Sequence, residues 1–228
     1  TRPYHSKIFH GGWHYFWDYS GGDLADCGIH QLDLTIMALG DPATPKSVSA
    51  SGGRLQHKGD DGEVPDVEIL HYDYPEFVMT FEHSHFANAM SKINGKIRSG
   101  DQFPYWPQCA TRIEFYGTKD NMMLGRHGGG WQVFTSGGKV VEEQYGRHPD
   151  LEHQQNFVDC IRNRKRPNAD VGLAHGSTTV MHMGNIAHRV GNQKLQFDSG
   201  AERFIGNDAA NLLSKRHNVN PYSVKEMA

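Results

Sequence analysis

Three pairs of strand-like segments, each joined by a short turn, constrain the fold of this chain more than any other feature. The pairs are Asp66–Tyr74 with Phe77–Phe86, Arg112–Tyr116 with Met122–Arg126, and Gly130–Thr135 with Lys139–Gln144. A short turn can join only strands that run antiparallel. Together with a strand over Lys46–Leu55, these pairs predict a largely antiparallel open sheet, which can leave one face free for a partner.

Helical patterns flank the predicted sheet in the sequence. A helix is predicted from Ile29 to Leu39, where apolar residues recur at helical spacing until Gly40 and Pro42 end the run. Residues 1–23, rich in Gly and aromatic side chains but without a period, predict a structured loop. The whole chain, 1–228, is therefore predicted to be a single α+β domain with helices packed on one face of the sheet. Its later helices are predicted over Leu151–Arg164, Val171–Val190 and Asn207–Lys215.

The composition excludes several classes of function. The chain has 23 Lys and Arg against 26 Asp and Glu, so no overall positive field would attract nucleic acid or an anionic membrane surface. No apolar run approaches the roughly 20 residues that span a bilayer. Neither nucleic acid nor membrane is therefore predicted as a partner. The three cysteines are isolated from one another, which fits a reducing compartment such as the cytoplasm.

The sequence also lacks the phosphate-binding loops of nucleotide enzymes. It contains no G-x-G-x-x-G after a strand and no G-x-x-x-x-G-K-[ST]. The run Gly128-Gly129-Gly130 lies between two strand-like segments, without a helix behind it to supply amide donors, and is predicted to be a turn. We therefore expect that this chain does not bind a dinucleotide by itself, and we assign no cofactor-binding residue.

The segment Gly21–Asp33, GGDLADCGIHQLD, carries the sharpest candidate for chemistry. Asp26 and His30 are four residues apart and His30 and Asp33 three apart, so a helix would gather their side chains at one end. A carboxylate beside an imidazole favours the protonated ring and fixes its tautomer, which suits proton exchange with a substrate hydroxyl near neutral pH. The plainer alternative is that Asp26 caps the helix and His30 is a surface residue.

Aromatic side chains crowd the segment that precedes this motif. In HGGWHYFWD, residues 10–18, flat rings could stack on the apolar faces of a sugar while His14 and Asp18 bond its hydroxyls. Trp13 and Trp17 could equally anchor the loop to the core, because large aromatic residues dominate core packing. Both interpretations stay open, and the substrate-binding candidates are Trp13, His14, Trp17 and Asp33.

The abundance of histidine, 15 residues, raises the question of a metal site. His83 and His85 are two apart on a predicted strand, so their side chains would face the same way. A metal site needs a third ligand and supporting contacts around the ligands. The sequence identifies neither, so no metal ligand is assigned.

Several motifs, in order along the chain, resemble the glucose–fructose oxidoreductase/inositol dehydrogenase (Gfo/Idh/MocA) family. The segment GGDLADCGIHQLD matches the G-G-x-x-x-D-x-G-x-H-x-x-D motif in the carboxy-terminal domain of those enzymes. The resemblance covers essentially the whole chain. Further segments look like the family's first sheet strand, a strand pair, the F-x-G-T strand and turn, and the closing helices: Pro45–Gly53, Val64–His83, Ile113–Thr118 and His153–Pro167.

This resemblance implies an architecture. Members of the family join an amino-terminal Rossmann domain, with its glycine-rich fingerprint and a catalytic Lys in an E-K-P motif, to an α/β domain whose open sheet usually packs against another subunit. Neither the fingerprint nor the E-K-P motif occurs in this chain. By resemblance, the chain is the second domain without the first, NAD or NADP is held by the absent domain, and the open sheet face forms a homo-oligomer.

The resemblance also implies roles for the motif residues. His30 would accept the proton from a sugar or polyol hydroxyl as hydride leaves the same carbon for nicotinamide. Asp26 would orient the substrate or hydrogen-bond to it, and Asp33 matches the last acid of the motif. His14 and Trp17 lie in the loop that leads to the motif, where family members often contact substrate.

Two other functions remain open at this point. A stand-alone domain of this kind could act as a lyase or hydratase on a keto-sugar or keto-glycoside. His30 and Asp26 would then be acid and base, with a possible divalent metal at the edge that carries His83 and His85. The chain could also be a non-catalytic scaffold that joins two subunits.

Overall fold

The computed structural model describes residues 6–98, 100–126 and 128–215, so the loop expected over residues 1–23 is described only from residue 6. The chain divides into two compact units. The first comprises Thr1–Asp26, Ala43–Ser84 and Thr179–Ala228, and the second comprises Cys27–Pro42 and His85–Thr178. Each unit combines antiparallel strands with helices, which confirms the predicted α+β class.

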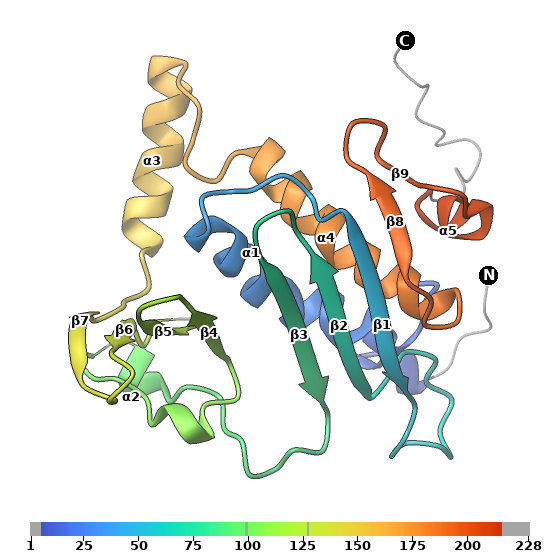
Figure 1. Cartoon of the computed structure of the whole chain (residues 1–228), viewed down its shortest axis with the longest axis horizontal. Helices are drawn as coiled ribbons and strands as arrows, with labels where there is room; N and C mark the ends of the chain where they lie inside the picture. Colours follow the sequence, from blue (N-terminus) through green and yellow to red (C-terminus); the bar gives the residue numbers. More distant parts are fainter. Residues whose placement is uncertain (1–5, 99, 127, 216–228) are drawn as a thin grey trace. The chain divides into compact units, whose positions relative to one another are not determined.

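The first unit is built on a sheet of five strands in the order β3-β2-β1-β8-β9. Every neighbouring pair runs antiparallel, and Figure 1 shows β1, β2 and β3 side by side. The backbone N–H of Tyr74 donates to the Phe77 carbonyl at 3.0 Å and closes the turn between β2 and β3. The strands are β1 (Ser47–Gly53), β2 (Val67–Asp73), β3 (Val78–Ser84), β8 (Leu195–Asp198) and β9 (Arg203–Phe204).

Side chains alternate along β2, and this alternation separates the two faces of the sheet. Glu68, Leu70 and Tyr72 are buried, because successive residues of a strand point to opposite faces. Ile69 and His71, between them, are exposed. The sheet therefore has one face in the core of the unit and one face open, as its sequence predicts.

Helix α4 (Val171–Arg189) covers the buried face with its residues from Thr179 onward, which belong to the first unit. Gly184 permits the close approach of helix and sheet. A Cβ atom at Gly184 would lie 2.5 Å from Leu70 Cδ1 and 2.6 Å from the Tyr72 hydroxyl oxygen. The side chains that α4 buries around this glycine recur at helical spacing: Val180, Met183 and Ala187.

Short elements complete the first unit. The opening segment forms two 3₁₀ turns, η1 (Ser6–Ile8) and η2 (Gly12–Tyr15). Near the carboxyl end, α5 (Asp208–Leu213) begins where the Asn207 side chain accepts a hydrogen bond from the Ala210 N–H at 2.9 Å.

The second unit contains a sheet of four strands in the order β4-β5-β6-β7, again antiparallel throughout. Its core gathers around Ile93, Trp106 and Cys109. The indole N–H of Trp106 donates to Gln132 Oε1 at 2.8 Å, so this ring is buried with its polar atom satisfied. The elements are α1 (Ile29–Ala38), α2 (Gly95–Arg98), η4 (Trp106–Gln108), β4 (Arg112–Tyr116), β5 (Asn121–Gly125), β6 (Trp131–Phe134) and β7 (Val140–Gln144).

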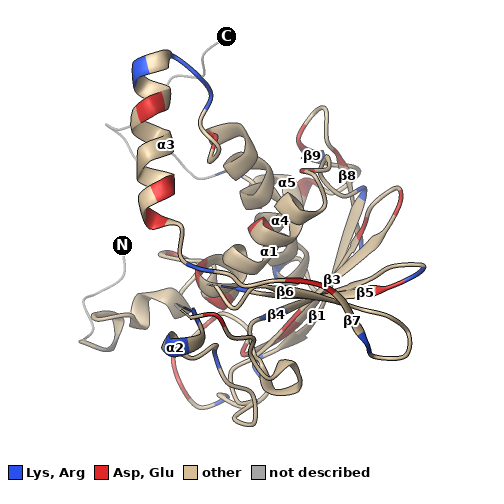
Figure 2. Cartoon of the chain, turned by 90° about the vertical axis from the view of Figure 1, so that its left-hand side faces the viewer, with Lys and Arg blue, Asp and Glu red and all other residues tan. Residues whose placement is uncertain are grey.

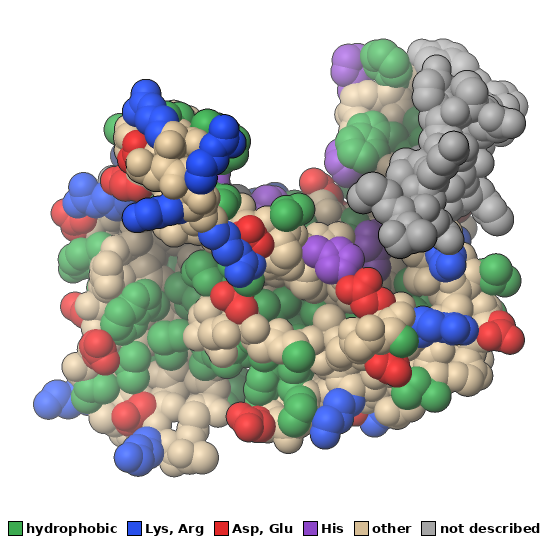
Figure 3. Space-filling model, turned by 90° about the horizontal axis from the view of Figure 1, so that it is seen from above, with side chains coloured by type: hydrophobic (Ala, Val, Ile, Leu, Met, Phe, Trp, Pro, Cys, Tyr) green, Lys and Arg blue, Asp and Glu red, His purple; other side chains and the backbone are tan. Residues whose placement is uncertain are grey.

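Helix α3 (Asp150–Asn163) also belongs to the second unit, and none of its residues, all of which are described, is buried. Asp150 and Glu152 lie in its first turn and Arg162 in its last, where their charges complement the helix dipole. Figure 2 shows this acidic beginning and basic end. Figure 3 shows basic side chains gathered at this end. In the sequence, the helix is followed directly by Arg164, Lys165 and Arg166.

The predicted helices and strands lie within about two residues of their predicted ends. The sequence missed β8 and β9 because they are only four and two residues long, too short for an alternating pattern to be recognised. The strands form two sheets, since β3 pairs only with β2.

Within the described ranges, no helix has both the length and the apolar character that crossing a bilayer requires.

Candidate functional site

The motif begins with two glycines because neither position has room for a side chain. A Cβ atom at Gly21 would lie 2.5 Å from the amide nitrogen of Asn185. One at Gly22 would lie 2.9 Å from Val64 Cβ, and Gly22 has a φ of +69°, which residues with side chains rarely adopt. The Asn185 amide donates to the Gly21 carbonyl at 3.0 Å and holds this segment against α4.

Asp26 lies in a widened turn of helix. The segment η3 (Leu24–Gly28) is π-helical and is followed directly by α1 (Ile29–Ala38). Single π-helical turns occur frequently at functional sites. Leu24 is buried in the first unit, whereas the Asp26 side chain is exposed. The widened turn therefore presents a carboxylate at the surface while its beginning is anchored in the core.

His30 and Asp33 are both exposed on α1, in the second unit. Leu32 and Ile36 are buried on the same helix, so its apolar spacing marks the packed face as predicted. The imidazole of His30 therefore lies on the exposed side of α1, in its first turn.

His14 gives Asp26 a neighbour that the sequence did not predict. The Nε2 atom of His14 lies 3.8 Å from Oδ1 of Asp26. On the other side of the ring, Nδ1–H donates to the Gly11 carbonyl at 2.7 Å. Because a carbonyl oxygen can only accept, this bond places the proton of the neutral ring on Nδ1 and leaves Nε2 as an acceptor facing Asp26. An imidazole acceptor beside a carboxylate can bind hydroxyl groups.

Trp13 extends this pair with an apolar surface. Its ring stacks on His14 with centroids 3.7 Å apart, and 42% of its surface is exposed. A ring in this position can support the apolar face of a ligand whose hydroxyls reach His14 and Asp26. The sugar-platform interpretation therefore has its best geometry at Trp13.

Trp17 is held by the core of the first unit on several sides. Its backbone N–H donates to Glu63 Oε2 at 3.0 Å. The guanidinium carbon of Arg189, on α4, lies 5.0 Å from the centroid of its ring. Phe16, next to it, is buried. These contacts favour an anchoring role for this part of the opening segment.

In the second unit, Arg126 braces the residues around His30. Arg126 is 7% exposed, and its Nη1 donates to the Cys27 carbonyl and to Gln31 Oε1, both at 3.2 Å. It therefore ties the beginning of α1 to the end of β5. No motif marks Arg126 in the sequence, because a single Arg after a strand resembles any other surface charge.

A buried polar group lies between the first sheet and α4. Glu68 is fully buried, and burial raises its pKa to about 7. Tyr72 shares its face, and burial and then the nearby Glu68 charge raise the pKa of its hydroxyl. Neither side chain has a hydrogen-bond partner among the described residues. The imidazole of His83 lies beside Glu68, with its Nδ1 3.9 Å from Glu68 Oε2.

The structure thus brings three of the six candidate residues together, since His14 lies next to both Trp13 and Asp26 in the first unit. Trp17 lies beyond them along the same segment, against α4. The pairing of Asp26 with His30 stays a prediction, as do the roles assigned to each residue. Arg126 and the buried Glu68 are additions that only the folded chain reveals, because both depend on contacts between distant segments.

Comparisons with protein families agree with this architecture. A family model described as "GFO/IDH/MocA C-terminal domain" matches residues 1–122. The chain belongs to the Gfo/Idh/MocA family. A second model, described as "Oxidoreductase family, C-terminal alpha/beta domain", matches residues 112–224. Among curated proteins, none matches this chain.

Solved structures share the fold of this Gfo/Idh/MocA domain at low sequence identity. Aldose–aldose oxidoreductase from Caulobacter crescentus, complexed with glycerol, is 15% identical with a TM-score of 0.57 over 81% of this chain and 50% of its own. UDP-N-acetylglucosamine 3-dehydrogenase GnnA from Acidithiobacillus ferrooxidans is 14% identical, with a TM-score of 0.54 over 84% and 52%. WlbA dehydrogenase from Bordetella pertussis, in complex with NADH and UDP-GlcNAcA, is 16% identical, with a TM-score of 0.50 over 87% and 52%. This chain spans about half the length of these structures.

The glycine run of this Gfo/Idh/MocA chain does not fit a dinucleotide. Gly128, Gly129 and Gly130 all have positive φ and lie in the turn before β6, which begins at Trp131. A phosphate cradle needs a helix amino terminus behind its glycines to supply N–H donors, and here a strand follows. The run is the turn that the sequence predicts.

Proposed function

We propose that this chain is the substrate-binding and catalytic-base domain of a nicotinamide-dependent sugar or polyol oxidoreductase. Membership of the Gfo/Idh/MocA family supports this assignment. The main structural support is the way in which the motif Gly21–Asp33 folds. Asp26 is exposed in a π-helical turn and His30 is exposed in the first turn of α1. The family match gives no support to the lyase alternative.

The chain's own part in the reaction is to bind the substrate and to move a proton. Oxidation of a secondary alcohol to a carbonyl removes a hydride from carbon, and a nicotinamide held by a separate domain supplies the acceptor. The hydroxyl proton goes to the neutral imidazole of His30. General-base catalysis of this kind contributes about 10²–10⁴-fold to a rate.

His14, Asp26 and Trp13 orient the substrate. The Nε2 of His14 and the carboxylate of Asp26 accept hydrogen bonds from hydroxyl groups, and the exposed ring of Trp13 supports an apolar face of the sugar. A vicinal diol suits this arrangement, because two hydroxyls on neighbouring carbons can reach two acceptors that lie 3.8 Å apart.

Binding measurements on the chain itself test this assignment. Isothermal titration calorimetry with glycerol, glucose and UDP-N-acetylglucosamine is expected to detect binding of at least one of them, weakened about 10-fold in Asp26→Asn. Titration with NAD and NADP is expected to detect no tight binding. Tight dinucleotide binding would contradict the proposal, and so would an affinity for the sugar that is unchanged in Asp26→Asn.

The open face of the first sheet is the surface we assign to a second copy of the chain. Ile69 on β2 and Val78 on β3 are exposed large apolar residues there, and exposed apolar surface on a sheet face marks an interaction site. Sedimentation of the purified chain should show a dimer or larger oligomer that Val78→Glu dissociates. A monomeric wild-type chain would contradict this assignment.

A further inference from the structure

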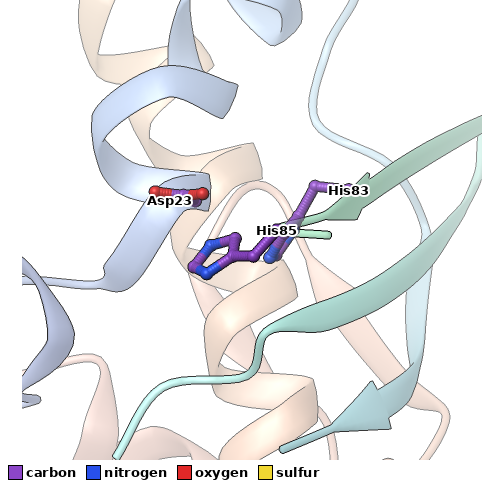
Figure 4. A group of neighbouring side chains, drawn as sticks. All are labelled: Asp23, His83 and His85. Carbon is purple, nitrogen blue, oxygen red and sulfur yellow. The ribbon is translucent and has the colours of Figure 1, made fainter. Parts of the chain in front are cut away.

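Asp23 and His83 come together in the first unit from segments far apart in the sequence. Asp23 lies directly before the π-helical turn η3, and His83 lies near the end of β3. Their ligand atoms, a carboxylate oxygen and an imidazole nitrogen, are within 4.8 Å of each other. Figure 4 draws both side chains, with His85 two residues after His83.

A buried carboxylate stands behind His83. Glu68 pairs with His83 across β2 and β3, is 0% exposed, and has its Oε2 3.9 Å from His83 Nδ1. Neither oxygen of Glu68 has a hydrogen-bond partner within the described ranges. A buried carboxylate without a hydrogen-bond partner is costly when it is ionised, so a cation near this position would stabilise its ionised form.

We propose that Asp23 and His83 are ligands of a divalent transition-metal ion of the zinc class. With Nδ1 facing Glu68, the Nε2 atom of His83 is the ring nitrogen that would coordinate the ion. A metal-bound imidazole commonly has a carboxylate next to its second nitrogen, where it orients the ring and increases its basicity. Glu68 is the residue in that position.

The donor set decides which class of ion the site would take. Imidazole nitrogen suits Zn²⁺ and its neighbours in the first transition row, whereas Ca²⁺ and Mg²⁺ prefer oxygen donors alone. Asp23 and His83 supply one oxygen and one nitrogen donor, and water would complete the coordination of the ion.

An ion at this position would stabilise the start of the helical segment formed by η3 and α1, and it would not contact the substrate. Asp23 precedes Asp26 by three residues, so a metal held by Asp23 and His83 would fasten the beginning of that helix to the end of β3. The site is independent of the proton transfer assigned to His30. An ion that binds only the folded chain stabilises it in proportion to the logarithm of its concentration.

Metal titration of the untagged chain tests the proposal. ZnCl₂ is expected to bind with a stoichiometry of one ion per chain by calorimetry, and to raise the midpoint of thermal unfolding. MgCl₂ at the same concentration is expected to do neither. Asp23→Asn and His83→Ala should each abolish the stoichiometric binding. His71→Ala is the control, because His71 is exposed on β2 beside Asp73 and lies on the other face.

Glu68→Gln separates metal binding from folding. This variant keeps the shape of the side chain and removes its charge, so without metal it should unfold at the same or a higher temperature. Its affinity for Zn²⁺ should fall about 10- to 100-fold, as when other carboxylates behind a ligand histidine are removed. The proposal is wrong if wild type binds no Zn²⁺ stoichiometrically, or if Asp23→Asn, His83→Ala and Glu68→Gln all retain wild-type affinity.

Discussion

His14 Nε2 lies 3.8 Å from Asp26 Oδ1, while Nδ1–H of the same ring donates to the Gly11 carbonyl at 2.7 Å. The bond to Gly11 fixes which nitrogen carries the proton of the neutral ring, so two acceptor atoms, His14 Nε2 and Asp26 Oδ1, lie next to each other. The pair joins the aromatic opening segment to the motif. Its separation exceeds a hydrogen-bond length, which favours a role in binding over a role in stability.

His14→Ala and Asp26→Asn should each raise KM for the sugar substrate about 5- to 30-fold, since each removes a hydrogen bond to a charged or oriented acceptor. If the two residues bind one diol, the double variant should raise KM by less than the product of the single effects. The free energy of unfolding should change by less than about 1 kcal/mol, because the pair is partly exposed.

His71→Ala is the matched control for that experiment, because it removes an exposed imidazole from the opposite face of the first sheet. KM should not change in this variant. Fully multiplicative effects of His14→Ala and Asp26→Asn would show that the two residues do not share a ligand.

Arg126→Lys should lower the free energy of unfolding by about 1 kcal/mol. Lysine keeps the charge but lacks the planar fork that reaches both the Cys27 carbonyl and Gln31. Urea denaturation followed by circular dichroism measures the difference. Arg147→Lys, at an exposed ion pair with Asp101, should change stability by less than about 0.5 kcal/mol, and equal effects of the two substitutions would refute the bracing role.

Gly184→Ala should destabilise the chain by about 1–3 kcal/mol, because the new methyl group would meet Leu70 and the Tyr72 hydroxyl at 2.5 and 2.6 Å. Gly176→Ala on the same helix has no atom within 4 Å of the new carbon. It should stabilise by up to about 1 kcal/mol through helix propensity. The midpoint of thermal unfolding should fall in Gly184→Ala and rise in Gly176→Ala if α4 packs as described. Shifts of the same sign in both variants would contradict this packing.

Asp66 makes the stability of the first unit depend on pH. Burial alone would raise its pKa, but the backbone N–H groups of His57, Leu55 and Gln56 donate to the carboxylate and together lower the pKa to about 2. A pKa below the unfolded value of about 4 stabilises the folded state above pH 4. This contribution, about 2 kcal/mol, is lost as pH falls from about 4 to about 2.

Asp66→Asn measures that contribution directly. Wild type should exceed the variant in free energy of unfolding at pH 6, and the difference should shrink steadily below pH 4. Asp73 stays in both proteins, so the low pKa that it owes to hydrogen bonds from Lys194 and Ser47 cancels in the comparison. A difference independent of pH between 3 and 6 would count against the hydrogen-bonded carboxylate.

Sequence patterns were sufficient for the elements whose side chains repeat regularly. The alternation in β2 and β3 and the helical spacing of Leu32 and Ile36 follow from burial of one face, which local sequence records. The π-helical turn around Asp26 has no such repeat. It follows two glycines that fit against Asn185 and Val64, which come from elsewhere in the chain.

The candidate site was predictable only in part for the same reason. Motif resemblance selected Asp26 and His30, because their identity and spacing are local. His14, which lies next to Asp26, is predicted as a candidate because it lies among the aromatic residues of the opening segment. Its distance from Asp26 depends on how that segment folds. In the sequence, Glu68 does not differ from other strand residues. Its position opposite His83 depends on the pairing of β2 with β3.

Replacement of His30 in the oxidoreductase that contains this domain tests whether its imidazole is the catalytic base. His30→Ala, with folding checked by circular dichroism, should lower kcat for oxidation of the sugar or polyol by about 10²–10⁴-fold, while the affinity for the nicotinamide cofactor stays unchanged. An unchanged kcat in a folded His30→Ala enzyme would contradict the account.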